Sequence, residues 1–345
     1  MTATNGATIF GCAGPELGAD EAAFFRDADP WGFILFARNV ESPDQLRRLT
    51  DGLRASVGRD APVFVDQEGG RVQRLRAPHW REWLPPLEMV RLATAGAPSG
   101  HARIVAERAV WLRYRIIASE LRAVGIDGNC APCLDVATGA THEFLKNRCL
   151  SDDPARVARL GRAAANGLLS GGVLPVVKHM PGHGRATLDT HKALPTVSEG
   201  AEVLASTDFA PFAALSDMPL AMTAHIVFSA FDARPATQSP EVVRLIRDRI
   251  GFAGVLMTDD LNMEALSGSL AQRTAASLAA GCDIALHCKG DLGQMIEVAA
   301  AAGRLDTATQ ARADAALGWR REPEYADIVQ LESELTGLLD GQGHV

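Results

Sequence analysis

The sequence predicts an α/β protein built as a single (β/α)₈ barrel. Eight short apolar runs recur along the chain, and several are apolar throughout, as expected of strands that helices cover on both faces. Segments with helix start and stop signals separate the runs. Polar side chains end several of the runs, and the carboxyl ends of barrel strands all meet at one face. A doubly wound sheet is the alternative, but no Gly-x-Gly-x-x-Gly follows a strand to indicate dinucleotide binding.

Each candidate strand is a run of five to eight mostly apolar residues. In order, the eight runs are residues 8–12 (TIFGC), 32–36 (GFILF), 62–66 (PVFVD), 129–136 (NCAPCLDV), 173–179 (VLPVVKH), 219–225 (PLAMTAH), 254–259 (GVLMTD) and 282–287 (CDIALH).

The intervening helices begin at capping residues. Ser42, Asp153 and Ser239 each precede a proline, which is favoured at the first helical position. Glycines near residues 58, 171 and 251 are expected to end these helices in the left-handed conformation. A further helix is expected in LAQRTAASLAAG before the eighth run. After residue 290 we expect one final helix and an acidic tail, so that residues 1–345 form one catalytic barrel domain with a helical tail from about residue 291.

Composition excludes several classes of partner. The net charge is −8 and no run of Lys and Arg is present, which argues against nucleic acid. No apolar run approaches the roughly 20 residues that span a bilayer, so no membrane association is expected. The six cysteines fit free thiols in a reducing compartment, and the N-terminus lacks the pattern of a signal peptide. We therefore expect a cytoplasmic protein, as a monomer or weak dimer.

The third run is followed by DQEGGRVQR, residues 66–74. Two glycines allow a close approach of the backbone, and Arg71 and Arg74 would lie one turn apart if a helix begins here. A salt-bridged loop is one interpretation. The other is a clamp on a polyhydroxyl ligand, in which Asp66 accepts hydrogen bonds from hydroxyl groups and Arg74 donates them.

The seventh run ends in two adjacent aspartates. A carboxylate at the end of a buried strand is costly to desolvate unless it has partners or a task. Asp259 is our candidate nucleophile, and Asp260 is our candidate for a helix N-cap.

The fifth run ends in KHMPGHGRATLDTH, residues 178–191, which we expect to form a loop over the barrel mouth. Asp189 and His191 are two residues apart, so in an extended segment the aspartate could hold the imidazole as a general acid/base. His183 is expected to organise the loop. His179, His183, Asp189 and His191 also have the chemistry of zinc ligands, but they match no strong zinc spacing, and we expect no metal and no cofactor.

Two further features carry less information. Cys130-Ala-Pro-Cys133 has the spacing of a redox motif, but it lies in a predicted strand instead of at a helix N-terminus, so core thiols are expected. Arg148 precedes a well-marked helix start and could reach a ligand over the barrel mouth.

Taken together, DQEGGRVQR, NR before SDDP, KHMPGHG, DTH and TDDLNMEAL resemble the single-domain bacterial β-N-acetylglucosaminidases of glycoside hydrolase family 3. The resemblance runs in order from about residue 30 to about residue 290. It implies a retaining exo-hydrolase that removes terminal β-linked N-acetylglucosamine, in the cytoplasm, from GlcNAc-anhydro-N-acetylmuramyl peptides during cell-wall recycling. Met180 replaces the usual phenylalanine of the family motif, which affects loop packing more than catalysis.

The resemblance also implies roles for individual residues. Asp259 would be the nucleophile, and His191 with Asp189 the acid/base. The sugar-binding positions would be Asp66, Arg74, Arg148, Lys178 and His179. Asp259 would form a covalent glycosyl-enzyme that water then hydrolyses with retention.

Other functions remain open from the sequence. Within the family these are a β-glucosidase, a β-xylosidase, and a phosphorylase in which phosphate replaces water, since a neutral imidazole repels an anion less than a carboxylate does. Outside it, a metal-dependent barrel hydrolase and a non-catalytic sugar-binding protein would use the same residues. The expected partner is a muropeptide or another small glycan that ends in β-linked GlcNAc.

Overall fold

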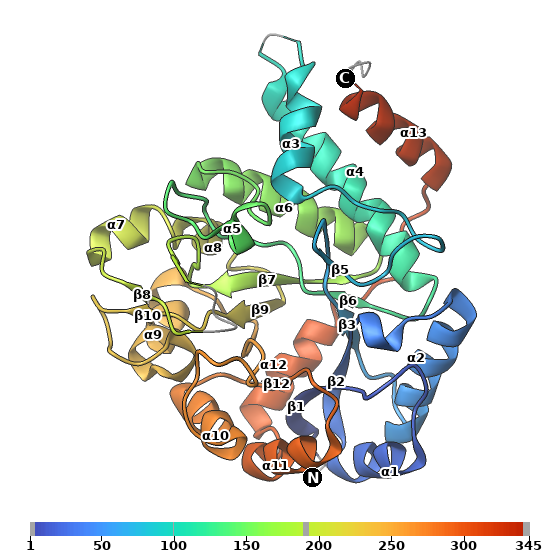
Figure 1. Ribbon diagram of the computed structural model, residues 1–345, viewed down its shortest axis with the longest axis vertical. Helices are drawn as coiled ribbons and strands as arrows, with labels where there is room; N and C mark the ends of the chain where they lie inside the picture. Colours follow the sequence, from blue (N-terminus) through green and yellow to red (C-terminus); the bar gives the residue numbers. More distant parts are fainter. Residues whose placement is uncertain (1–3, 99, 189–192, 341–345) are drawn as a thin grey trace.

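The computed structural model describes residues 4–98, 100–188 and 193–340. Its centre is an eight-stranded sheet with the strand order β11-β9-β7-β6-β3-β2-β1-β12, in which neighbouring strands are parallel. A further parallel bridge between Met257 of β11 and Ile284, next to β12, joins the two outer strands of this order. The sheet therefore closes on itself with helices around it (Figure 1), and the predicted (β/α)₈ barrel is confirmed.

Each predicted apolar run overlaps one barrel strand, although the fourth run, 129–136, overlaps its strand only at Asn129. The strands are β1 (Gly6–Gly11), β2 (Pro30–Leu35), β3 (Val63–Val65), β6 (Gly128–Asn129), β7 (Leu174–Met180), β9 (Leu220–Thr223), β11 (Val255–Met257) and β12 (Ala285–His287). Every residue of these strands is buried, which explains why the runs lack apolar–polar alternation. Two small sheets lie outside the barrel and pair β4 (Gln67–Gly69) with β5 (Val72–Gln73) and β8 (Thr196–Val197) with β10 (Val227–Phe228).

Helices connect successive strands and form the outer layer in Figure 1. They are α1 (Ala19–Ala28), α2 (Pro43–Val57), α3 (Pro86–Ala95), α4 (Ala102–Arg122), α5 (Glu143–Lys146), α6 (Pro154–Ser170), α7 (Ala201–Ser206), α8 (Ala210–Ala214), α9 (Pro240–Leu245), α10 (Leu270–Ala280) and α11 (Leu292–Ala302). Short irregular turns of helix, η1 (Ala37–Asn39), η2 (Ala236–Gln238) and η3 (Ile246–Ile250), complete the connections, and η3 continues α9.

The predicted helix starts are confirmed, because each capping side chain accepts a hydrogen bond from the first turn. The distances are 3.3, 2.5 and 3.1 Å for Ser42, Asp153 and Ser239. Gly58 and Gly251 end their helices with φ of 64° and 80°, as a left-handed cap requires. Gly171 differs from the prediction, because its φ is −90° and the next residue, Gly172, takes the positive φ of 75°.

A helix that would place Arg71 and Arg74 one turn apart does not begin here, because this segment forms the antiparallel hairpin β4–β5. Gly69 and Gly70 take φ of 107° and 59°, which L side chains rarely adopt, and this turns the chain back. The Gln67 side chain then accepts hydrogen bonds from the amides of Arg74 and the following residue at 2.9 and 3.1 Å. The side chains that follow β3 are thereby held at the barrel mouth.

The expected single helix and acidic tail at the end of the chain are also wrong. Three helices follow residue 290, namely α11, α12 (Thr307–Leu317) and α13 (Ile328–Leu339). Helix α12 packs against β11, and α13 packs against α3 and α4 (Figure 1). The last helix is held against the rest of the protein instead of forming a free acidic tail. Glu334 receives two 2.7 Å hydrogen bonds from Arg108, and Leu335 and Leu338 are buried.

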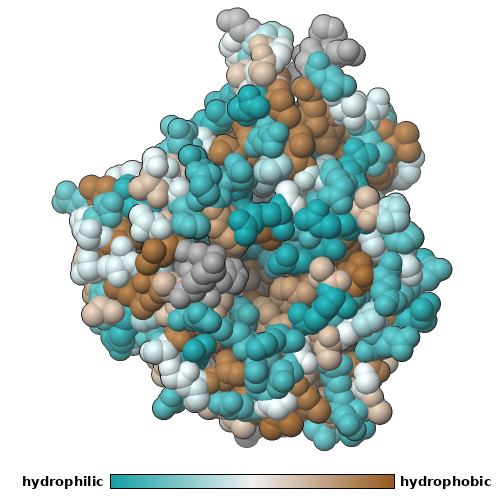
Figure 2. Space-filling view, viewed as in Figure 1, coloured by the Kyte–Doolittle hydropathy of each residue, from teal (hydrophilic) through white to brown (hydrophobic). Residues whose placement is uncertain are grey.

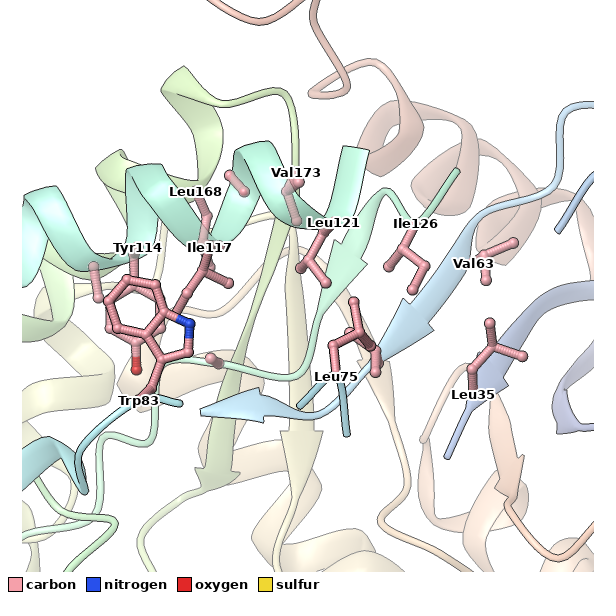
Figure 3. Close-up of a cluster of buried hydrophobic side chains, with 14 of the residues drawn as sticks. Leu35, Val63, Leu75, Trp83, Tyr114, Ile117, Leu121, Ile126, Leu168 and Val173 are labelled. Carbon is pink, nitrogen blue, oxygen red and sulfur yellow. The ribbon is translucent and has the colours of Figure 1, made fainter. Parts of the chain in front are cut away.

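The largest core cluster lies between the barrel strands and several surrounding helices, among them α2, α4 and α6. Figure 3 shows Tyr114, Ile117 and Leu121 of α4 beside Leu168 and Val173, all of them buried. Burying each such apolar side chain contributes about 1.5–3 kcal/mol. This packing fixes the ends of β3 and β6, from which several residues of the candidate site project.

Two expectations about composition can also be compared with the structure. All six cysteines are free thiols, as predicted, and Cys130 and Cys133 are buried just beyond the end of β6 instead of within it. None of the helices formed by residues 4–98, 100–188 and 193–340 has the length and apolar character needed to cross a membrane.

Candidate active site

A cavity of about 250 Å³ opens at the carboxyl ends of the barrel strands. Figure 2 shows hydrophilic residues gathered near the centre of this face. Six of the predicted site residues line the cavity: Asp66, Arg74, Arg148, Lys178, His179 and Asp259. The remaining two, Asp189 and His191, lie outside the described residues. Leu188, the last residue described before them, lines the cavity.

Four of these residues form one largely buried charge network with Glu68, which the sequence analysis did not single out. Lys178 Nζ lies 2.7 Å from Asp66 Oδ1 and 2.6 Å from Glu68 Oε1. Arg148 donates two hydrogen bonds to the Glu68 carboxylate, at 2.9 and 2.8 Å. Arg74 donates to Asp66 at 2.9 Å. Glu68 is therefore the acceptor that orients both cations across the floor of the cavity.

The network keeps its members charged at neutral pH. Burial alone would raise the pKa of Asp66, but Lys178 and Arg74 hold it well below its usual range. Burial is likewise outweighed at Glu68, where Arg148 and Lys178 lower the pKa to about 2. Burial opposes the charged form of Lys178, but the two carboxylates raise its pKa. These charged donors and acceptors can bind the hydroxyl groups of a sugar with charge-assisted hydrogen bonds.

His179 is oriented by a second residue that the sequence analysis missed, Asp135. The Asp135 Oδ2 atom lies 2.7 Å from His179 Nδ1, and Asp135 Oδ1 accepts a 2.7 Å hydrogen bond from the His183 amide. Because a carboxylate only accepts, the hydrogen-bond network assigns a proton to His179 Nδ1. The Nε2 atom, 3.3 Å from Arg148 Nη2, is then an acceptor that faces the cavity.

Asp259 follows β11, which lies across the barrel from β3 and the β4–β5 hairpin that follows it. Burial would raise its pKa, but His179, His225, the Asp260 amide and Lys178 together lower it. Among the described residues, the donor to its carboxylate is the Asp260 amide, 2.8 Å from Oδ1. Asp259 is thus an ionised carboxylate at the cavity wall, which is the state that a nucleophile requires.

Asp260 is not a helix N-cap as expected. Its Oδ1 atom accepts hydrogen bonds from Cys288 N at 3.1 Å and from the amide and side chain of Asn262, both at 3.2 Å. The chain makes successive turns after Asp260, and Ser269 caps the next helix, α10. His225 Nε2 lies 3.1 Å from the Asp260 carbonyl oxygen, so the backbone beside Asp259 is held from two sides.

The loop after β7 is fixed up to its undescribed residues. Both peptide bonds that flank the pair His179 and Met180 are cis, and Met180 is fully buried. Gly184 allows a close approach, because a Cβ there would lie 1.9 Å from the Val136 carbonyl oxygen. The amide of His183 anchors the loop, while burial lowers the pKa of its ring to about 4, so that the imidazole is neutral. The expectation that His183 organises this loop agrees with these contacts.

The chain also resembles known proteins. The family model described as the N-terminal domain of glycosyl hydrolase family 3 matches residues 18–317. A protein named beta-hexosaminidase from Methylococcus capsulatus is 40% identical over 285 residues, which are 81% of this chain and 82% of the relative. Another from Xylella fastidiosa is 37% identical over 318 residues, 90% and 92% of the two chains.

Solved structures of similar fold agree with these relatives. NagZ from Neisseria gonorrhoeae, in complex with N-trifluoroacetyl-D-glucosamine, superposes with a TM-score of 0.82 at 32% identity. The match covers 98% of this chain and 96% of the other. A family 3 β-N-acetylglucosaminidase from Paenibacillus gives a TM-score of 0.80 at 28% identity, with 98% of this chain and 62% of the other covered.

Proposed function

The chain belongs to glycosyl hydrolase family 3, and from this premise we propose that it is a retaining exo-hydrolase acting through an aspartyl glycosyl-enzyme. Its relatives establish the broader activity, that of a glycoside hydrolase of the β-N-acetylhexosaminidase type, which acts on a glycan. The proposal adds the mechanism, the residues and the natural substrate.

The observation that carries the proposal is the ionised Asp259 carboxylate on the wall of a cavity that also holds the charged sugar-binding candidates. Asp259 attacks the anomeric carbon through an oxocarbenium-like transition state, and the bond to the departing oxygen breaks. The resulting ester between Asp259 and the sugar is hydrolysed by water, so that the product keeps the β configuration.

The acid/base in this proposal is His191, held by Asp189. His191 protonates the departing oxygen in the first step and deprotonates water in the second. The support is the family resemblance, together with Leu188, which lines the cavity immediately before these residues. The pair Asp135 and His179 has the same chemistry and faces the same cavity, so substitutions must discriminate between the two histidines.

Sugar recognition in the proposal uses Asp66, Arg74, Arg148, Lys178 and His179. Asp66 accepts from hydroxyl groups, the three cations donate to them, and His179 accepts at Nε2. The support for the four charged residues is the network of 2.6–2.9 Å contacts that orients their side chains, and His179 is oriented by its 2.7 Å contact with Asp135. Sites whose side chains are held before the substrate binds lose less entropy on binding.

The natural substrate that we propose is a GlcNAc-1,6-anhydro-MurNAc-peptide, cleaved during peptidoglycan recycling in the cytoplasm. This step rests on the family resemblance, and the six free thiols are consistent with a reducing compartment. We also propose that residues 1–345 act as one catalytic domain, since the C-terminal helices pack against the barrel and its surrounding helices.

The test compares hydrolysis of an aryl β-N-acetylglucosaminide with that of the matching β-glucoside, with and without a chelator. We expect preferential cleavage of the N-acetyl substrate, no effect of the chelator, and the β anomer as the first product by proton NMR. Loss of activity with the chelator would support a metal-dependent hydrolase instead. Equal rates on the two sugars, or an α product, would contradict the proposed specificity or mechanism.

Asp259→Asn should abolish turnover while leaving the fold intact. Asp51→Asn is the matched control, because Asp51 is an exposed residue of α2. A near-wild-type rate in Asp259→Asn would exclude this residue as the nucleophile.

A further inference from the structure

We propose that Arg71 and Phe144 form a second subsite at the mouth of the cavity, which binds a carboxylate on the leaving group, the part of the substrate that departs from the sugar. The proposal deepens the proposed function and rests on it, because only a hydrolase of glycosides has a leaving group to recognise. Arg71 is then a specificity-determining residue for substrates with an acidic leaving group, such as one that carries a peptide.

The Arg71 guanidinium lies over an aromatic ring. Its Cζ atom is 3.9 Å from the centroid of the Phe144 ring, and both side chains line the cavity. A cation within about 6 Å of a ring centroid is attracted by the negative face of the ring. A guanidinium on a ring face keeps the N–H groups of its edge, which can donate two parallel hydrogen bonds to a carboxylate. The ring therefore orients Arg71 before a ligand binds.

Arg71 differs from the other three Lys and Arg side chains that line the cavity. Arg74, Arg148 and Lys178 each contact an acidic side chain at 2.6–2.9 Å. Within residues 4–98, 100–188 and 193–340, Arg71 forms no ion pair with a carboxylate. Its side chain is also exposed, so its charge is available to an anionic group that enters from solvent.

The contacts of the segment around Phe144 indicate the leaving-group side of the cavity. The Phe144 ring also faces Arg148, a sugar-binding candidate, with 5.4 Å from Cζ to centroid. The amide of His142, the residue before helix α5, donates to the Ala186 carbonyl oxygen at 3.1 Å. This bond ties the segment to the loop after β7, which leads in sequence to the proposed acid, His191. Because the acid protonates the departing oxygen, the leaving group must lie beside this loop.

The backbone that carries Arg71 is fixed, although the side chain is exposed. Arg71 lies in the turn between β4 and β5. The amide of Gly70 donates to the Trp83 carbonyl oxygen at 2.7 Å, and the carbonyl oxygen of Gly70 accepts from Arg76 Nη2 at 2.7 Å. An anchored turn and a stacked side chain lose less entropy when a ligand binds than a free arginine would.

The experiment compares glycosides that differ in the charge of the leaving group. The substrates are the 3- and 4-carboxyphenyl β-N-acetylglucosaminides and the corresponding uncharged carboxamides. The measured quantity is the ratio of kcat/KM for each acid to kcat/KM for its amide. Acid and amide also differ in leaving-group reactivity, but this difference is common to all variants and cancels when their ratios are compared.

Arg71→Gln is the test variant, and Arg71→Lys is the conservative one, because lysine keeps the charge but loses the planar fork. Lys146→Gln is the matched control. It removes one positive charge from the same helix as Phe144, at a side chain that is 42% exposed and lies outside the cavity. Phe144→Leu removes the ring and keeps both charges.

We expect Arg71→Gln to lower the acid-to-amide ratio about 5–10-fold for at least one of the two acids. Arg71→Lys should keep part of the preference for the acid. Phe144→Leu should lower the ratio about 2–5-fold, as the loss of an exposed cation–π contact implies. Lys146→Gln should stay within about twofold of the wild type. The wild-type ratio should fall as the salt concentration rises, because salt screens an exposed ion pair.

Equal ratios in the wild type and Arg71→Gln would overturn the proposal. An equal fall in Arg71→Gln and Lys146→Gln would also overturn it, because the general charge of the region would then explain the preference. An unchanged ratio in Phe144→Leu would remove the ring from the subsite.

Failure of the proposed function is seen separately. If none of the four glycosides is hydrolysed, the proposed function fails, and calorimetric dissociation constants for the same four compounds then supply the comparison. Tighter binding of an acid than of its amide, lost in Arg71→Gln, would still support the subsite. Equal binding of acids and amides would refute it.

Discussion

Glu68 gives the sharpest test of the charge network, through the variant Glu68→Gln. This residue is 1% exposed and accepts from Arg148 at 2.9 and 2.8 Å and from Lys178 at 2.6 Å. Substitution by glutamine keeps the shape but removes the charge of the carboxylate that pairs with Arg148, while Lys178 keeps its contact with Asp66. Breaking a buried ion pair by removing one partner typically costs about 3–5 kcal/mol.

The control is Glu82→Gln, which makes the same chemical change at the surface. Glu82 contacts Arg76 at 2.7 Å, but its side chain is 51% exposed, and such pairs are worth about 0–1 kcal/mol. The free energy of unfolding in urea, followed by circular dichroism, measures both variants. Because folded domains are typically stable by about 5–15 kcal/mol, Glu68→Gln should still fold.

We expect Glu68→Gln to lose about 3–5 kcal/mol and to show a raised KM, since Arg148 loses its orientation toward the sugar. Glu82→Gln should stay within about 1 kcal/mol of the wild type in stability, with an unchanged KM. If the two variants are equally stable, the network does not hold the site together, and the argument from buried charge is refuted.

Three further predictions concern the same candidate site. The pKa of Glu68 is about 2 in the folded protein against 4.5 for the unperturbed group, so the ionised carboxylate stabilises the folded state. This contribution to the free energy of unfolding is complete above pH 4.5 and is lost as the pH falls toward 2. It should be absent from the acid unfolding curve of Glu68→Gln. His191→Ala should lose most activity on a substrate with a poor leaving group and much less on an activated aryl glycoside. His179→Ala should lose similar amounts of activity on both substrates. If instead His179→Ala shows the larger loss on the poor leaving group and His191→Ala loses equally on both, His179 is the acid. Asp135→Asn should lower kcat/KM about 10–100-fold by removing the charge-assisted hydrogen bond to His179, and an unchanged value would count against that role.

Much of the fold could be predicted because it depends on local signals. Parallel barrel strands are buried on both faces, so they stand out as apolar runs, and helix caps such as Ser42 use residues three positions apart. The hairpin at Gly69 and Gly70 was missed because two adjacent positive φ values reverse the chain, while charge spacing alone suggested a helix. The C-terminal helices were missed because their acidic residues are paired with arginines distant in sequence, as Glu334 is with Arg108.

In the candidate site, too, local signals could be predicted from the sequence, whereas contacts between residues distant in sequence could not. The residues that line the cavity follow strand ends, which the barrel topology brings together. Glu68 and Asp135 were not singled out, because their importance comes from partners 80 and 44 residues away in sequence, Arg148 and His179. A signal was present for Asp135, which lies near the end of the fourth apolar run, as Asp66 and Asp259 lie at the ends of theirs.

The most direct test of the account is to trap the glycosyl-enzyme. The protein is incubated with a slowly hydrolysed fluorinated N-acetylglucosaminyl substrate that carries a good leaving group, and the labelled peptide is identified by mass spectrometry. The account predicts that one sugar is attached and that the modified residue is Asp259. A label on any other residue, or complete turnover with no attached sugar at any time, would contradict it.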